Sequence, residues 1–163
     1  GPRGGEGAGM SEEPLKNRDL AALHPAFRLK LERLLETLAR AGVPFRLDEG
    51  FRSAERQAWI YGSGRLRPGP ILTQKDGQPG LWPPTHAVVS ERGKARRSRH
   101  QSGLAADLYP VRPDGRVWIP PASHEAWVLL ATTARALGLR AGRDWGDAPH
   151  VEWAGALPKG EAS

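Results

Sequence analysis

The stretch SRHQSGLAAD, residues 98–107, decides how this chain folds and what it can bind. It carries His100 and Asp107, and a third candidate ligand, His150, follows in the later stretch DAPHVEW, residues 147–153. Two imidazoles and one carboxylate form a three-ligand set for zinc. Such a set leaves the fourth position open for water, which is typical of a catalytic rather than a structural site.

The spacing of these ligands suggests how strands present them. We expect His100 at the end of one strand and Asp107 on the next, with a tight turn at Gly103 between them. His150 lies in an alternating segment, where Glu152 points to the same face of a strand.

A water activated by a metal needs a neighbouring group that takes its proton. Asp147 lies three residues before His150, in a turn that contains Pro149, and Glu152 lies two residues after it. On the residues alone, both carboxylates are candidates for this base.

Helical and alternating apolar patterns are mixed along the chain without βαβ regularity, which predicts an α+β fold. Ser53 and Ser123 are candidate N-caps, and Gly42 and Gly138 are candidate helix stops. Residues 62–97 have a loop-like composition, with many Gly and Pro and a basic run. The pattern predicts helices over 25–41, 54–61 and 123–137, and strands over 43–47, 104–109, 139–145 and 150–153.

The length of 163 residues suits one domain. We expect a flexible segment over 1–19, a folded domain over 20–157 that carries the candidate zinc ligands, and a tail over 158–163. Native translation is expected to start at Met10, the only Met, with vector-derived residues before it. No secretory signal is visible, so we expect a protein made in the cytoplasm.

Composition excludes several kinds of site. The absence of Cys excludes disulfides, thiolate zinc sites and cysteine nucleophiles. No apolar run approaches the ~18 residues of a membrane span. The net charge of +6 fits either a polyanionic partner or a plainly solvated surface, and composition does not decide between them.

The string Ser98-x-His100-x-x-Gly103-x-Ala105-x-Asp107 resembles the signature of zinc peptidases that act on peptidoglycan. This is the D-alanyl-D-alanine carboxypeptidase group, which shares its fold with lysostaphin-type enzymes and hedgehog signalling domains. The resemblance implies a small antiparallel sheet that carries the zinc site, flanked by helices.

Further strings resemble the L-alanyl-D-glutamate endopeptidase branch, which includes many phage endolysins and some bacterial autolysins. The resemblance runs from about residue 20 to residue 153. The strings are Leu23-His24-Pro25, Gly50-Phe51-Arg52-Ser53 with Gln57, Gly64-Arg65-x-Arg67-Pro68-Gly69 with Thr73, Asp144-Trp145, and Asp147-x-Pro149-His150-x-Glu152.

The resemblance implies one zinc ion per chain. It implies Asp147 as the catalytic base and Arg52 near the substrate carbonyl, where a guanidinium can stabilise an oxyanion or clamp a carboxylate. The implied zinc ligands are His100, Asp107 and His150, and the implied residues behind them or near substrate are Ser98, Gln57 and Glu152. The chain departs from the branch in a longer stretch between Thr73 and Ser98 and a shorter one between Trp145 and Asp147.

The expected function is therefore hydrolysis of peptidoglycan stem peptides, most simply at the L-Ala–D-Glu bond. The expected setting is a phage endolysin made in the host cytoplasm and released through a holin. The alternatives are a D-Ala–D-Ala carboxypeptidase, a bacterial autolysin, or a non-enzymatic basic module that binds cell wall or nucleic acid. We expect a monomer without membrane insertion or a nucleic-acid partner, whose residues 92–99 contact anionic wall polymers.

Overall fold

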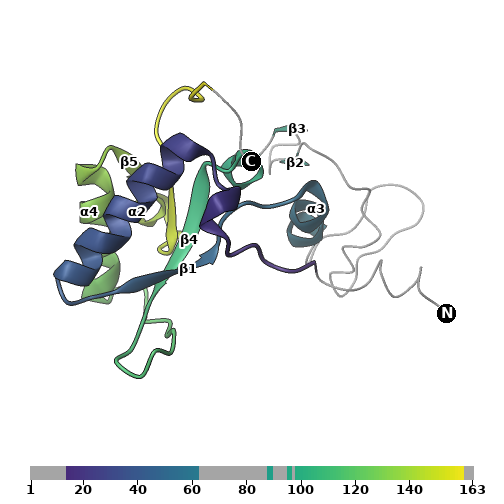
Figure 1. Ribbon diagram of the computed structural model, residues 1–163. Helices are drawn as coiled ribbons and strands as arrows, with labels where there is room; N and C mark the ends of the chain where they lie inside the picture. The colour runs from purple at the N-terminus through teal and green to yellow at the C-terminus, as the bar shows by residue number, and fades with distance from the viewer. Residues whose placement is uncertain (1–13, 63–87, 90–94, 97, 160–163) are drawn as a thin grey trace. The chain divides into compact units, whose positions relative to one another are not determined.

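The computed structural model describes residues 14–62, 88–89, 95–96 and 98–159 (Figure 1). The chain divides into two compact units. One comprises Gly1–Lys16 and Arg52–Gln101, and the other comprises Asn17–Phe51 and Ser102–Ser163. The domain limits expected from the sequence stay a prediction.

A four-stranded antiparallel sheet forms the centre of the second unit, as the predicted α+β class requires. The structure confirms the predicted strands over 104–109 and 150–153 to within one residue. In spatial order the strands are β1 (Phe45–Glu49), β4 (Ala105–Pro110), β6 (His150–Trp153) and β5 (Leu139–Ala141).

Alternation along β4 and β6 gives the sheet two chemically different faces. Ala106 and Leu108 are fully buried in the core, whereas Asp107 between them is only half-buried. On β6, the side chain of Val151 lies in the core, and His150 is its neighbour along the strand. Because neighbouring residues of a strand point to opposite faces, the polar candidates share the face away from the core.

Two helices supply the other half of this core, and Figure 1 shows them in the same unit as the sheet. Each fully buried leucine contributes on the order of 1.5–3 kcal/mol to folding. Helix α2 (Pro25–Arg40) follows a short 3-10 turn, η1 (Leu20–Ala22), and helix α4 (Glu125–Ala136) follows β4 along the chain. Their buried residues are Phe27, Leu31, Leu34 and Leu38 of α2, and Ala126, Trp127, Leu130, Ala131 and Ala134 of α4.

Three predicted boundaries in this unit were wrong, and the first is that of the strand over 43–47, which the structure places at Phe45–Glu49. Helix α4 is capped by His124, whose Nδ1 accepts a hydrogen bond from the Ala126 N–H at 3.0 Å, and not by Ser123. The predicted strand over 139–145 ends at Ala141, because the chain turns into a 3-10 helix, η4 (Gly142–Trp145). The stops were correct: Gly42 and Gly138 have φ values of 85° and 81°, a region that glycine adopts without strain.

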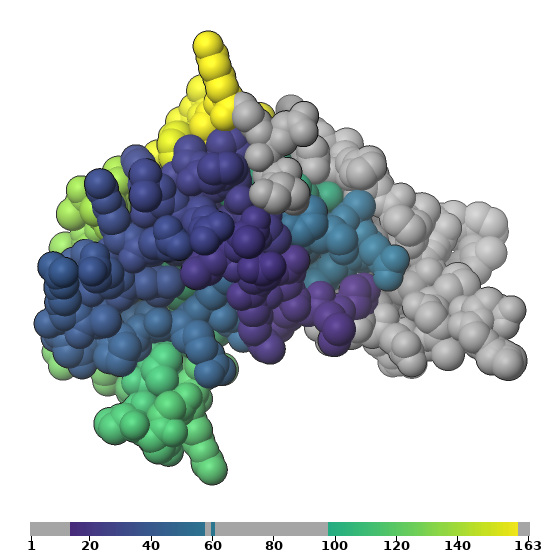
Figure 2. Space-filling view, viewed as in Figure 1, coloured from purple at the N-terminus to yellow at the C-terminus, as the bar shows by residue number. Residues whose placement is uncertain are grey.

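The loop after β4 lies at the end of that strand away from Asp107. An isolated bridge joins Val111 to Val117, and the loop is the green projection from the body in Figure 2. The Arg112 guanidinium lies 5.0 Å from the centre of the Trp118 ring. This loop therefore carries a cation–π pair of its own, separate from the candidate ligands.

The first unit contains helix α3 (Ala54–Gly62), which the sequence predicted, and a pair of two-residue strands, β2 (Val88–Val89) and β3 (Ala95–Arg96). Ser53 caps α3 as expected, since its Oγ accepts from the Arg56 N–H at 3.1 Å. Most of the predicted loop over 62–97 lies outside the described residues. No helix in the described part of the chain is long and apolar enough to cross a membrane.

Candidate metal centre

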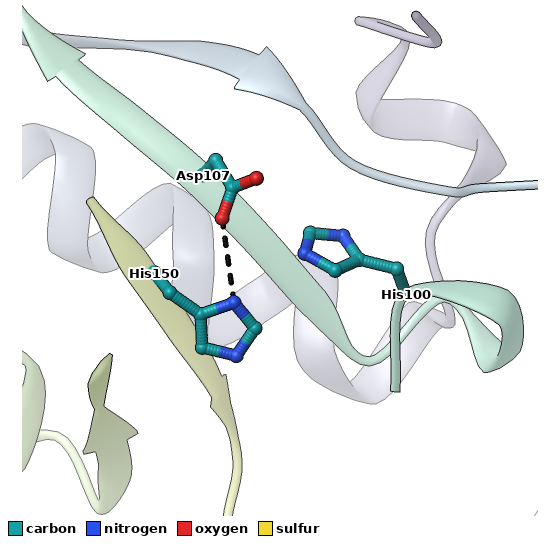
Figure 3. A group of neighbouring side chains, drawn as sticks. All are labelled: His100, Asp107 and His150. Carbon is teal, nitrogen blue, oxygen red and sulfur yellow. Dashed lines mark ion pairs between the residues drawn. The ribbon is translucent and has the colours of Figure 1, made fainter. Parts of the chain in front are cut away.

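Asp107 and His150 face each other across β4 and β6. They are direct partners in the antiparallel register, and the His150 Nδ1 lies 3.3 Å from the Asp107 Oδ1 (Figure 3). Directly paired side chains on one face of an antiparallel sheet lie close together. The sheet thus holds two of the three predicted ligands in contact.

His100 comes from a short 3-10 helix, η3 (Arg99–Ser102), and not from the end of a strand as predicted. The local sequence explains the difference: the Ser98 Oγ accepts from the His100 N–H at 3.2 Å, and the Ser98 carbonyl accepts from the Gln101 N–H at 2.9 Å. These hydrogen bonds stabilise a 3-10 turn, so the segment does not pair as a β-strand. Gly103, with φ 70°, then redirects the chain into β4.

The three predicted ligands form a group. One possible ligand atom from each of His100, Asp107 and His150 lies within 4.8 Å of the others. In Figure 3 their side chains converge from η3, β4 and β6. Two donors bound at about 2.1 Å to one tetrahedral zinc lie roughly 3.4 Å apart, and the 3.3 Å between the His150 Nδ1 and the Asp107 Oδ1 matches that spacing.

Three carboxylates surround the buried imidazole of His150. Asp107 and Asp147 approach the Nδ1, the latter through its Oδ2 at 3.8 Å, while the Glu152 Oε1 lies 2.8 Å from the Nε2. Burial alone would lower the pKa of His150. The hydrogen bonds to Asp107 and Glu152, with the charges of Asp107 and Asp147, outweigh burial and raise its pKa to about 9.

This arrangement fits a divalent metal by its donor chemistry. An ionised carboxylate can only accept, so the Nε2 of His150 donates to Glu152, and a metal bound at this imidazole would displace the proton of the Nδ1. Once deprotonated, the Nδ1 is the nitrogen that could bind a metal, on the side where Asp107 lies. A histidine ligand whose second nitrogen donates to a carboxylate is the common arrangement in metal sites.

Arg52 and Gln57 meet at the start of α3. The Arg52 Nη1 donates to the Gln57 Oε1 at 2.9 Å, and the Arg52 backbone N–H donates to the His100 carbonyl at 3.0 Å. Gln57 is buried, with 8% of its surface exposed. The structure therefore brings together the Arg52 and Gln57 of the predicted set and links Arg52 to the backbone of a candidate ligand.

Three residues around His150 escaped the sequence analysis as site residues. The Arg140 Nη1 lies 3.3 Å from the Glu152 Oε2, and its guanidinium lies 4.9 Å from the centre of the Trp145 ring. The Trp145 ring meets the His150 ring edge-on at 5.7 Å. A Cβ on Gly142 would lie 2.3 Å from the Asp147 carbonyl oxygen. The alternating pattern Leu139-Arg140-Ala141 was the one available signal for Arg140.

The chain resembles known peptidases. Residues 92–153 match the family model described as D-alanyl-D-alanine carboxypeptidase. The peptidoglycan L-alanyl-D-glutamate endopeptidase CwlK of Bacillus subtilis (strain 168) is 28% identical over 139 residues, which cover 80% of this chain and 72% of that protein.

Two solved structures have a similar fold. The L-Ala D-Glu endopeptidase ChiX of Serratia marcescens superposes with a TM-score of 0.50 at 25% identity, over 88% of this chain and 92% of that one. The vancomycin resistance D,D-pentapeptidase VanY, solved in complex with Zn(II), gives a TM-score of 0.50 at 18% identity over 82% of this chain and 73% of that one. At that identity, VanY supports the fold alone.

Proposed function

We propose that the chain is a zinc-dependent endopeptidase that cleaves stem peptides between L-alanine and D-glutamate, because it resembles peptidoglycan-hydrolysing metallopeptidases of the D-alanyl-D-alanine carboxypeptidase family. The observation that carries the proposal is the convergence of His100, Asp107 and His150. We propose that this group holds one zinc ion per chain. The names of CwlK and ChiX support the choice of bond.

A bound zinc ion supplies Lewis-acid chemistry, since it activates water and stabilises negative charge on a carbonyl oxygen. Asp147 is the proposed base. Its carboxylate lies on the Nδ1 side of His150 and is half exposed, so it can reach a water that approaches the ligands. It accepts the proton of that water as the carbonyl is attacked, and later donates a proton to the leaving amine.

Arg52 is the proposed electrostatic partner of the substrate. A guanidinium can stabilise the developing oxyanion or clamp a substrate carboxylate through two parallel hydrogen bonds. The hydrogen bond to Gln57 limits the freedom of the Arg52 side chain. The D-Glu residue keeps a free carboxylate in this linkage, which a cationic residue attracts.

A D-Ala–D-Ala carboxypeptidase is the second candidate, because the matched family model carries that description. Mass analysis of digested muropeptides separates the two. Cleavage at L-Ala–D-Glu releases peptides that begin with D-Glu, whereas carboxypeptidase action releases single D-Ala residues. Release of D-Ala alone would overturn the proposed bond specificity.

The proposed biological role is that of a phage endolysin, and a bacterial autolysin is the alternative. The purified protein should reduce the turbidity of cells stripped of their outer membrane, and a chelator should abolish this activity. A His150→Ala variant is the matched control. Wall binding without any hydrolysis in the zinc-loaded protein would instead favour the non-enzymatic binding module.

A further inference from the structure

We propose that Arg140 is a positioning residue of the metal centre, which acts on the ligand His150 through Glu152 and is itself held in place by Trp145. This inference rests on the proposed function, because it concerns how one of the proposed ligands is oriented. Arg140 and Trp145 are not among the proposed metal ligands.

Arg140, Glu152, His150 and Trp145 form a ring of successive side-chain contacts. Arg140 and Glu152 are cross-strand partners in the register of β5 and β6, and the guanidinium holds one carboxylate oxygen at 3.3 Å. The other oxygen accepts from His150 at 2.8 Å. Trp145 completes these contacts, with its ring 4.9 Å from the Arg140 guanidinium and 5.7 Å from the His150 ring.

The exposed fractions of these side chains show that the Glu152 carboxylate is the group that needs a charged partner. Glu152 has only 12% of its side chain exposed, and His150 has 9%, whereas Arg140 has 54%. A carboxylate removed from water requires a charged partner to stay ionised at low cost. Arg140 supplies that charge from the solvent side and leaves the inner oxygen of Glu152 for His150.

Arginine suits this position better than lysine. Its planar guanidinium can bond a carboxylate and stack on an aromatic ring at the same time. Half-exposed Trp145 therefore restricts the rotation of Arg140 about its long stem. With Arg140 fixed, the plane of the Glu152 carboxylate is fixed, and the His150 Nδ1 keeps its direction toward Asp107.

Two physical effects of removing Arg140 have opposite signs. Loss of a positive charge near a cation site would by itself strengthen metal binding, whereas loss of orientation weakens it. Removal of partners behind metal ligands commonly costs 10–100-fold in affinity. We place Arg140 near the lower end of that range, because it acts one contact further out.

The test measures zinc affinity by chelator competition in the full-length chain, with the thermal unfolding of the metal-free protein as a check on the fold. Arg140→Met is expected to weaken zinc binding about tenfold. Arg143→Met, which removes the same charge from the adjacent turn, should change affinity less than twofold. Arg140→Lys should recover little of the loss. Full recovery by lysine, or equal effects at positions 140 and 143, would overturn the proposal.

A double-mutant cycle with Glu152→Gln tests the route of the effect. If Arg140 acts through Glu152, Arg140→Met should change zinc affinity less than twofold in the Glu152→Gln background. In NMR spectra of the zinc-loaded protein, the Nε2–H of His150 should exchange faster in Arg140→Met than in Arg143→Met. A tenfold loss that persists in both backgrounds would refute the route.

The same data distinguish failure of this inference from failure of the proposed function. If the wild-type chain binds zinc and releases peptides that begin with D-Glu while the Arg140 variants match it, only the positioning role fails. If the wild-type chain binds no zinc, the proposed function fails.

Discussion

Exchange of Asp147 for Asn provides the sharpest test of the proposed chemistry, with Glu152→Gln as its counterpart. Both carboxylates touch the same imidazole, but from opposite edges. Asp147 approaches the Nδ1, the nitrogen that faces Asp107, and Glu152 bonds the Nε2. A base must reach a water on the ligand side of the ring, and only Asp147 lies on that side.

The expected magnitudes differ accordingly. Asn has nearly the same size as Asp but accepts no proton, so Asp147→Asn should lose the general-base contribution of roughly 10²–10⁴-fold. That loss corresponds to about 2.7–5.5 kcal/mol in the activation barrier. Gln at position 152 still accepts from His150 through its carbonyl. Glu152→Gln should therefore weaken zinc binding about tenfold and retain most turnover once zinc is saturating.

The assay is release of peptide from purified muropeptides at saturating zinc, with zinc content matched by elemental analysis. Asp147→Asn should bind zinc and unfold at a temperature close to that of the wild type. The reverse ranking at equal zinc content would move the base to Glu152. Near-normal turnover of Asp147→Asn would refute the assignment of Asp147.

Further predictions concern the ligands, pH, one glycine and the basic run. Alanine at any one of the three proposed ligands should remove tightly held zinc and lytic activity together, as measured by elemental analysis and turbidity; stoichiometric zinc in such a variant would contradict the assignment of that residue. Zinc must displace a proton from His150, because the pKa of this residue is raised to about 9. The apparent affinity for zinc should therefore rise about tenfold per pH unit up to about pH 9, and calorimetry should detect the released proton. A zinc affinity that does not change with pH would contradict this. In the metal-free protein the stabilisation from charged His150 should be complete below its ordinary pKa of about 6.5 and lost as pH rises through about 9. Gly142→Ala should force the Asp147 turn to shift, destabilise folding by about 1–3 kcal/mol and weaken zinc binding, whereas Gly115→Ala, whose Cβ meets no atom within 4 Å, should leave zinc affinity unchanged. Neutralising the basic residues of 92–97 should weaken wall binding more at low salt than at high salt and spare cleavage of a short soluble peptide; collapse of that cleavage with intact wall binding would place the run in the active site.

Alternation and spacing predicted the elements that carry the site, but not every local turn. The apolar-polar pattern around Val151 correctly predicted β6 and the shared face of His150 and Glu152. His100 was misplaced on a strand because the side chain of Ser98 closes a 3-10 turn, and such side-chain bonds compete with ladder formation.

Strand register was the information that the sequence lacked. On the residues alone, Asp147 and Glu152 were both candidates for the base, whereas the structure distinguishes them, because Glu152 contacts the opposite nitrogen of His150. The pairing of Arg140 with Glu152 joins β5 to β6, and nothing in either segment alone specifies which residues face each other. Local patterns therefore predicted the candidate ligands more readily than the residues that contact them.

The hydrophobic core and the metal centre are set by the same register. Val151 is fully buried between His150 and Glu152, so a slip of β6 by one residue would turn Val151 outward and both polar side chains inward. That slip would forfeit about 1.5–3 kcal/mol for the valine and bury a carboxylate without its partners, which costs more. Packing of the apolar face thus opposes the one-residue slips that would separate His150 from Asp107, and this part of the register needs no stabilisation from a metal.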